Sequence, residues 1–81
     1  MKVRAQLFSR LKDATGNEHV DLELKDGARV SDLLTALFSQ FPELKAWEQS
    51  ILIGAGVEFV ARDHVLGEGE EISIMPPVQG G

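Results

Sequence analysis

The stretch ISIMPPVQGG, residues 72–81, joins a short alternating segment to two prolines and two glycines. Its two isoleucines alternate with Ser73 and Met75, a pattern typical of a strand with one buried face. The prolines lack an N–H group and fix φ, so they end the hydrogen-bond ladder and stiffen the exit from the sheet. The stretch therefore predicts a last strand that ends at Met75, followed by an extended tail over residues 76–81.

Two further alternating segments, KVRAQLF (residues 2–8) and VDLEL (residues 20–24), predict two strands near the start of the chain. Each places three apolar side chains on one face: Val3, Ala5 and Leu7 in the first, Val20, Leu22 and Leu24 in the second. A polar segment closed by Gly16 separates the strands, and KDG at residues 25–27 ends the second. We expect the two strands to pair in an antiparallel way.

An amphipathic helix follows, and Ser31 with Asp32 predicts its start, because a hydroxyl cap and an early acid favour a helix N-terminus. Apolar residues then recur at helical spacing at Leu33, Leu34, Leu37, Phe38 and Phe41. Pro42 ends the helix, because the residue before a proline avoids helical backbone angles.

The next segment, ELKAWEQ, predicts a short second helix with Trp47 covering the core, and residues 51–53 and 57–60 predict short strands. One helix packed across one mixed sheet is the layered arrangement that so small a chain can form. The expected fold class is α+β, with a domain over residues 1–75 and a C-terminal tail over residues 76–81.

Bulk properties exclude several classes of function. The 81-residue chain has no cysteine, so it can form neither a disulfide framework nor a thiol nucleophile. A net charge of −5 argues against a nucleic-acid partner, which selects basic surfaces. The N-terminus does not resemble a signal peptide, and no stretch approaches the ~20 apolar residues of a membrane span. We expect a cytoplasmic protein that does not bind a membrane.

The tail carries the most distinctive chemistry. Gly80 and Gly81 lack side chains and could pass through a channel too narrow for other residues. The four residues 78–81 can reach roughly 14 Å at ~3.5 Å each. The α-carboxylate of Gly81 is a poor electrophile until it is activated, for example as an acyl-adenylate. An amine nucleophile would then make the protein an isopeptide-linked tag, and a sulfur nucleophile would leave a thiocarboxylate. The alternative is an inert tail.

A second candidate site lies on the sheet face turned away from the helix. Alternation places Phe8, Phe59 and Met75 on that face, and neighbouring strands would join them into an apolar patch beside the tail. Aromatic residues and methionine are enriched in interface cores, so the patch predicts a partner-binding surface. The alternative is that these side chains fold over the sheet edge.

Other apparent motifs do not predict sites. In GAGVEF, Phe59 occupies the place where a dinucleotide-binding fingerprint has its third glycine. GEGEE is typical of a solvated turn, and His19 and His64 do not have metal-ligand spacing. Asp63 and His64 are adjacent in a loop, which favours a shared turn over a catalytic pair. The sequence predicts neither a metal site nor a catalytic pocket.

The chain as a whole, and DHVLGEGEEISIMPPVQGG (residues 63–81) in particular, resembles the family of molybdopterin synthase small subunits. Members are ubiquitin-like sulfur carriers with a β-grasp fold. The resemblance implies a protein that is not an enzyme on its own and binds no cofactor stably. An E1-like adenylyltransferase would use ATP to activate Gly81, a sulfur donor system would form the thiocarboxylate, and the large synthase subunit would receive the tail. The resemblance also suggests a heterotetramer of two small and two large subunits.

The resemblance assigns roles residue by residue. Gly81 is the carrier, Gly80 the narrow neck, and Pro76, Pro77 and Val78 the extended stem. Phe8, Phe59 and Met75 match positions of hydrophobic contact with partners. The sequence departs from the family at Met75, where a phenylalanine is common, and in LIGAGVEFV, which lacks a frequent asparagine and has Gly56 to form the turn.

Three alternatives remain open from the sequence. A carrier for thiamin thiazole synthesis shares the fold and the terminal glycines, although such carriers tend to lack the PPV stem. A protein modifier joined to lysines would use the same activated carboxylate. A plain interaction module with an inert tail would need no activated carboxylate.

Overall fold

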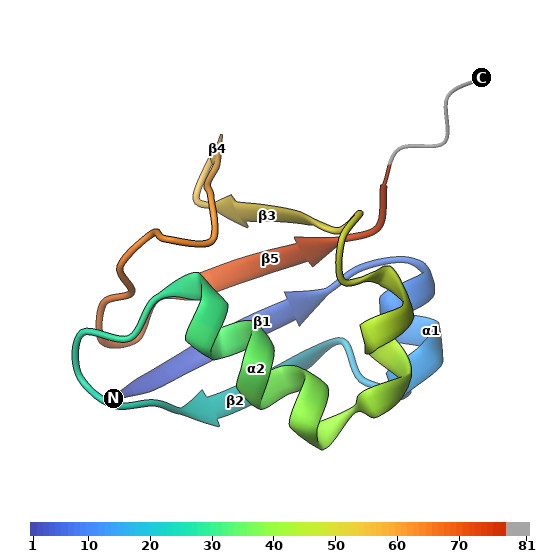
Figure 1. Ribbon diagram of the computed structural model, residues 1–81, viewed down its shortest axis with the longest axis horizontal. Helices are drawn as coiled ribbons and strands as arrows, with labels where there is room; N and C mark the ends of the chain where they lie inside the picture. The colour runs from blue at the N-terminus through green and yellow to red at the C-terminus, as the bar shows by residue number, and fades with distance from the viewer. Residues whose placement is uncertain (78–81) are drawn as a thin grey trace.

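The computed structural model describes residues 1–77 as one mixed sheet with a helix across one face (Figure 1). The strands are β1 (Lys2–Leu7), β2 (His19–Glu23), β3 (Leu52–Ala55), β4 (Glu58–Phe59) and β5 (Glu71–Met75). The helices are α1 (Arg10–Thr15), α2 (Val30–Gln40) and the 3₁₀ helix η1 (Pro42–Trp47).

The strand order is β2-β1-β5-β3-β4. β1 is antiparallel to β2, as expected, and parallel to β5, so the first and last strands lie side by side at the centre. β3 is antiparallel to both β5 and β4. This arrangement confirms the mixed sheet with one main helix across it. The predicted strands around residues 51–53 and 57–60 are displaced by one or two residues, because Gly54 and Ala55 pair with Phe59 and Glu58.

The core lies between α2 and the inner face of the sheet. The alternating residues of the strands meet five side chains of α2 there, namely Val30, Leu33, Leu34, Leu37 and Phe38. Phe41 and Trp47 are partly buried and pack against this cluster, so Trp47 covers one side of the core as predicted. Every fully buried side chain among residues 1–77 is apolar.

The predicted start of the helix at Ser31 is wrong by two residues. Arg29 holds the cap position, and its amide donates a hydrogen bond to the Asp32 carboxylate at 2.9 Å. The first free amides of α2 are satisfied by the loop before β5: Val30 donates to the carbonyl of His64, and Ser31 to that of Arg62. A local hydroxyl cap is therefore unnecessary, because a distant loop supplies the acceptors.

Candidate functional site: the outer sheet face and the tail root

The sheet face that α2 leaves uncovered, here called the outer face, leads directly to the tail. β5 ends at Met75, and the half-buried Pro76 and Pro77 follow it. The predicted site residues Val78, Gly80 and Gly81 lie outside the described residues. The division into a domain over residues 1–75 and a tail over residues 76–81 stays a prediction, and the end of β5 agrees with its boundary.

The outer face has an apolar end beside Pro76 and Pro77, where the tail begins. This end of the sheet is formed by Phe8, Leu52, Phe59 and Met75 and is here called the tail end. Phe8 and Phe59 are exposed, at 42% and 72% of their surface, and Leu52 and Met75 are partly exposed. The predicted patch depended on the strands of its three residues being neighbours, and this condition is not met for β4. β3 lies between β4 and β5, and so separates the strand of Phe59 from that of Met75.

Gly54 is the residue that brings Phe59 and Met75 together. It pairs with Phe59 on one side and with Ser73 on the other, so these three residues form one row across the sheet. An added Cβ at Gly54 would lie 3.3 Å from Met75 Cε, which places the methionine methyl directly over the glycine backbone. Phe59 and Met75 thus line one hollow of about 190 Å³, here called the Gly54 hollow.

Phe8 lies next to Met75 along the sheet but does not line the Gly54 hollow. Its amide donates to the carbonyl of Ile74 at 3.2 Å, which continues the β1–β5 ladder by one step. Ser9 then turns the chain with φ 57° and ψ −124°, and the Leu11 amide returns to the Phe8 carbonyl at 3.1 Å. The Phe8 ring faces a separate hollow lined by Gln6, Lys12 and His19 among others.

Leu52 and Gly54 were not predicted as site residues. Leu52 sits between two inward isoleucines and pairs with Met75, so alternation along β3 could have placed it on the outer face. Nothing local marks Gly54, because its effect depends on which strands flank it.

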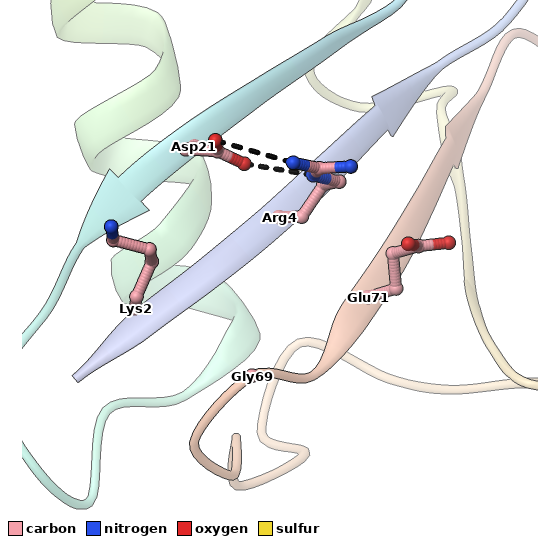
Figure 2. A pocket seen from close by; sticks show the side chains of 5 residues that line it. All are labelled: Lys2, Arg4, Asp21, Gly69 and Glu71. Atoms are coloured by element: carbon pink, nitrogen blue, oxygen red, sulfur yellow. Dashed lines mark hydrogen bonds and ion pairs between the residues drawn. The ribbon is translucent and has the colours of Figure 1, made fainter.

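The opposite end of the outer face is charged, and its hollow of about 230 Å³ is shown in Figure 2. This charged end consists of Lys2, Arg4, Asp21 and Glu71. Arg4 Nε donates to Asp21 Oδ1 at 2.8 Å, and Gln6 Nε2 donates to Glu71 Oε1 at 3.2 Å. The hydrogen bond raises the pKa of Arg4 and lowers that of Asp21. Arg4 and Asp21 thus pair with each other, Glu71 pairs with Gln6, and these contacts lie at the far end of β5 from the tail.

His64 and Glu70 form a pair in the loop before β5. The distance from His64 Nε2 to Glu70 Oε2 is 3.1 Å, and the Gly67 amide donates to Glu70 Oε1 at 2.8 Å. Burial would raise the pKa of Glu70, but these two hydrogen bonds outweigh it and the pKa is lowered. His64 therefore pairs with Glu70 rather than Asp63, and the contact holds the loop that caps α2.

Within residues 1–77, no three His, Asp or Glu side chains gather closely enough to hold a metal ion. None of the helices described here is long and apolar enough to cross a bilayer. Among residues 1–77, the tail end is the region that combines exposed apolar side chains with the end of the last strand.

The fold defines this chain as a ubiquitin-like β-grasp protein, a class to which SAMP1 from Haloferax volcanii also belongs by structure. That protein superposes with a TM-score of 0.90 at 26% identity, over 100% of both chains. A family model described as the ThiS family matches residues 5–81, and the chain belongs to that family. The β-grasp fold predicted from the sequence is confirmed.

Two further comparisons point to one kind of relative. A molybdopterin synthase sulfur carrier subunit of Chlamydomonas reinhardtii is 28% identical over 83 residues, which cover 100% of both chains. The chain is also similar to one from the protein–protein complex of subunits 1 and 2 of the molybdopterin-converting factor from Helicobacter pylori. There the TM-score is 0.71 at 26% identity, over 100% of both chains. These matches confirm the resemblance seen in residues 63–81.

Proposed function

We propose that this protein is the sulfur carrier subunit of a molybdopterin synthase, with the Gly81 carboxylate as the group that carries sulfur. One observation above all supports the proposal. The last strand stops at Met75 beside an exposed apolar surface, and it is followed by two prolines, which lack the N–H group needed to continue the hydrogen-bond ladder. A partner that docks on this surface is within reach of the tail.

The chemistry follows from the low reactivity of a carboxylate. An E1-like adenylyltransferase would join the Gly81 carboxylate to the AMP unit of ATP and release pyrophosphate. Sulfide supplied by a sulfur donor would then attack the Gly81 carbonyl carbon and displace AMP, which leaves a thiocarboxylate. Transfer of that sulfur to a pyranopterin precursor, with an oxygen from water taking its place, would restore the carboxylate.

The catalytic groups belong to the partners in this proposal. The chain would bind no cofactor of its own, and ATP would be consumed by the activating enzyme. The large synthase subunit would receive the tail, in a heterotetramer in the cytoplasm. The named pairing of subunits 1 and 2 in the Helicobacter pylori relative supports a partner of this kind.

The intact mass of the protein tests the proposal. The chain is incubated with an E1-like enzyme, ATP and a sulfur donor, or isolated from its own cells. We expect a fraction heavier by the difference between sulfur and oxygen, with the change located in the C-terminal peptide. An unmodified mass under these conditions contradicts the proposal.

A second candidate function is a protein modifier, which the similarity to SAMP1, the small archaeal modifier protein 1, favours. The same adenylate would then react with a lysine amine instead of a sulfur donor. Conjugates of higher mass with Gly81 in an isopeptide bond, found in digested lysates, distinguish this function from sulfur transfer.

A further inference from the structure

We propose that the Gly54 hollow is the seat of one apolar side chain that projects from the large synthase subunit. This inference rests on the proposed function, because it takes the protein that receives the tail as the partner. It assigns to Gly54 a part in docking, which is to keep the surface of β3 open between two flanking strands.

The hollow exists because one side chain is missing from a row of three. Phe59, Gly54 and Ser73 are paired across β4, β3 and β5. Neighbouring strands lie about 4.8 Å apart, so roughly 10 Å separates the outer two positions, and no side chain rises from the position between them. The Met75 methyl covers part of this floor, and Val57 stands fully exposed at the rim.

The size and lining of the hollow define its occupant. Its volume is about 190 Å³, and it is open to solvent on one side. That space suits one branched aliphatic or aromatic side chain. Phe59, Val57 and Met75 supply apolar walls, and the flexible thioether of Met75 can adjust to the shape of the incoming group.

The length of the tail limits how far from the Gly54 hollow the large subunit can bind. Met75 is the last residue of β5, and only Pro76 and Pro77 separate it from residues 78–81. The six residues 76–81 span at most roughly 21 Å at ~3.5 Å each. A protein that encloses Gly81 in its active site therefore lies within this distance of Met75, which lines the hollow. The proposed seat is continuous with the surface that the tail obliges this partner to cover.

Replacing Gly54 with alanine tests the inference. The new Cβ would lie 3.3 Å from Met75 Cε and 3.6 Å from Ser73 Cβ, so the flexible methionine end yields and moves into the hollow. The Gly54 backbone does not have the left-handed conformation that an added side chain would strain. We expect the dissociation constant for the large subunit of the same organism, measured by titration calorimetry, to rise roughly tenfold. Gly54→Val should raise it further.

Gly67→Ala is the matched control. It makes the same chemical change at another glycine without left-handed backbone, where the nearest atom to the new Cβ would be Glu70 Oε1 at 3.9 Å. We expect wild-type affinity. An unchanged or tighter complex with Gly54→Ala overturns the inference, as does an equal loss in both variants. A loss seen only with the activating enzyme overturns the choice of partner.

Two further measurements keep the test decisive. If Gly54→Ala lowers the melting temperature, the binding test is made instead with Val57→Ser, which changes the exposed rim of the hollow. Weaker binding of Val57→Ser to the large subunit supports the proposed seat, and wild-type binding overturns it. Failure of the proposed function is distinct, because the wild-type chain would then acquire no thiocarboxylate or would not bind the large subunit. A wild-type chain that does both, with Gly54→Ala binding equally well, removes only the seat.

Discussion

At the charged end of the outer face, polar side chains form hydrogen bonds with one another, whereas the tail end presents exposed apolar side chains. Arg4 binds Asp21 and Gln6 binds Glu71, so these four polar side chains have partners within the chain. Phe59 instead exposes most of its surface, and Phe8 exposes somewhat less than half. Fully burying such a side chain is worth about 1.5–3 kcal/mol.

The two ends share β1 and β5, so the difference is not one of separate strands. Arg4 lies in β1 and Phe8 directly follows it, and Glu71 and Met75 are the two ends of β5. The inner face is held to apolar residues by the core, but the outer face is free to vary along its length. Its apolar residues gather at the end from which the tail leaves, which is where a partner would be needed.

The largest effect is expected from removing Gly81. The shortened chain should form no thiocarboxylate and transfer no sulfur, because the carbonyl carbon that receives the sulfur is displaced from the partner's active site by one residue. Its denaturation midpoint should not change, since the core residues lie in the part of the chain up to β5. Intact mass after incubation with the activating enzyme measures this.

Gln79→Ala serves as the control for that deletion, because it keeps the tail length and both glycines. It should accept sulfur like the wild type. Sulfur transfer by the shortened chain would contradict the role of Gly81 as the carrier.

The adjacent residues Ile74 and Met75 lie on opposite faces of β5, so substitutions at these two positions compare the faces directly. Ile74 is 1% exposed on the inner face, so Ile74→Ala should lower the free energy of unfolding by about 2–5 kcal/mol in urea denaturation. Met75→Ala on the outer face should cost clearly less stability and weaken partner binding instead. Equal losses of stability would mean that Met75 is part of the core.

Phe59→Ala should weaken the complex with the large subunit. At 72% exposure the ring contributes little to folding, whereas burying it under a partner is worth about 1.5–3 kcal/mol, or more than tenfold in the dissociation constant. Val65→Ala is the matched control, since Val65 is 54% exposed in the loop that caps α2. Similar losses for both variants would contradict a docking surface confined to the tail end.

The smallest effect is expected from Asp21→Asn at the charged end. The Arg4 hydrogen bond lowers the pKa of Asp21, so the stability from this contact is present above the ordinary pKa of ~3.9 and is lost as the pH falls through the lowered value. The variant should therefore differ slightly from the wild type at neutral pH and converge with it in acid. Because both side chains are exposed, the difference in denaturation midpoint should be small.

Affinity for the large subunit should be unchanged in Asp21→Asn. A marked loss of affinity would show that the partner also covers the charged end, and the contrast between the two ends would lose its functional meaning.

Sequence patterns predicted the elements well and the relations between distant elements less well. The alternation of Ile72 and Ile74 located β5, and the prolines located its end. The helix start was misplaced at Ser31, because the amides of α2 are satisfied by carbonyls of a loop some thirty residues further along the chain. Phe59 and Met75 were rightly placed on one face, but the strand between them was not expected.

The sequence by itself determined the strand and helix pattern and the inward faces, because each depends on residues a few positions apart. Only the tertiary structure decided that β3 separates β4 from β5, and hence that Gly54 opens a hollow between Phe59 and Ser73. It likewise decided that Glu70 is the partner of His64. Strand order and such contacts depend on how segments distant in the chain share one core, and no local pattern reports that packing.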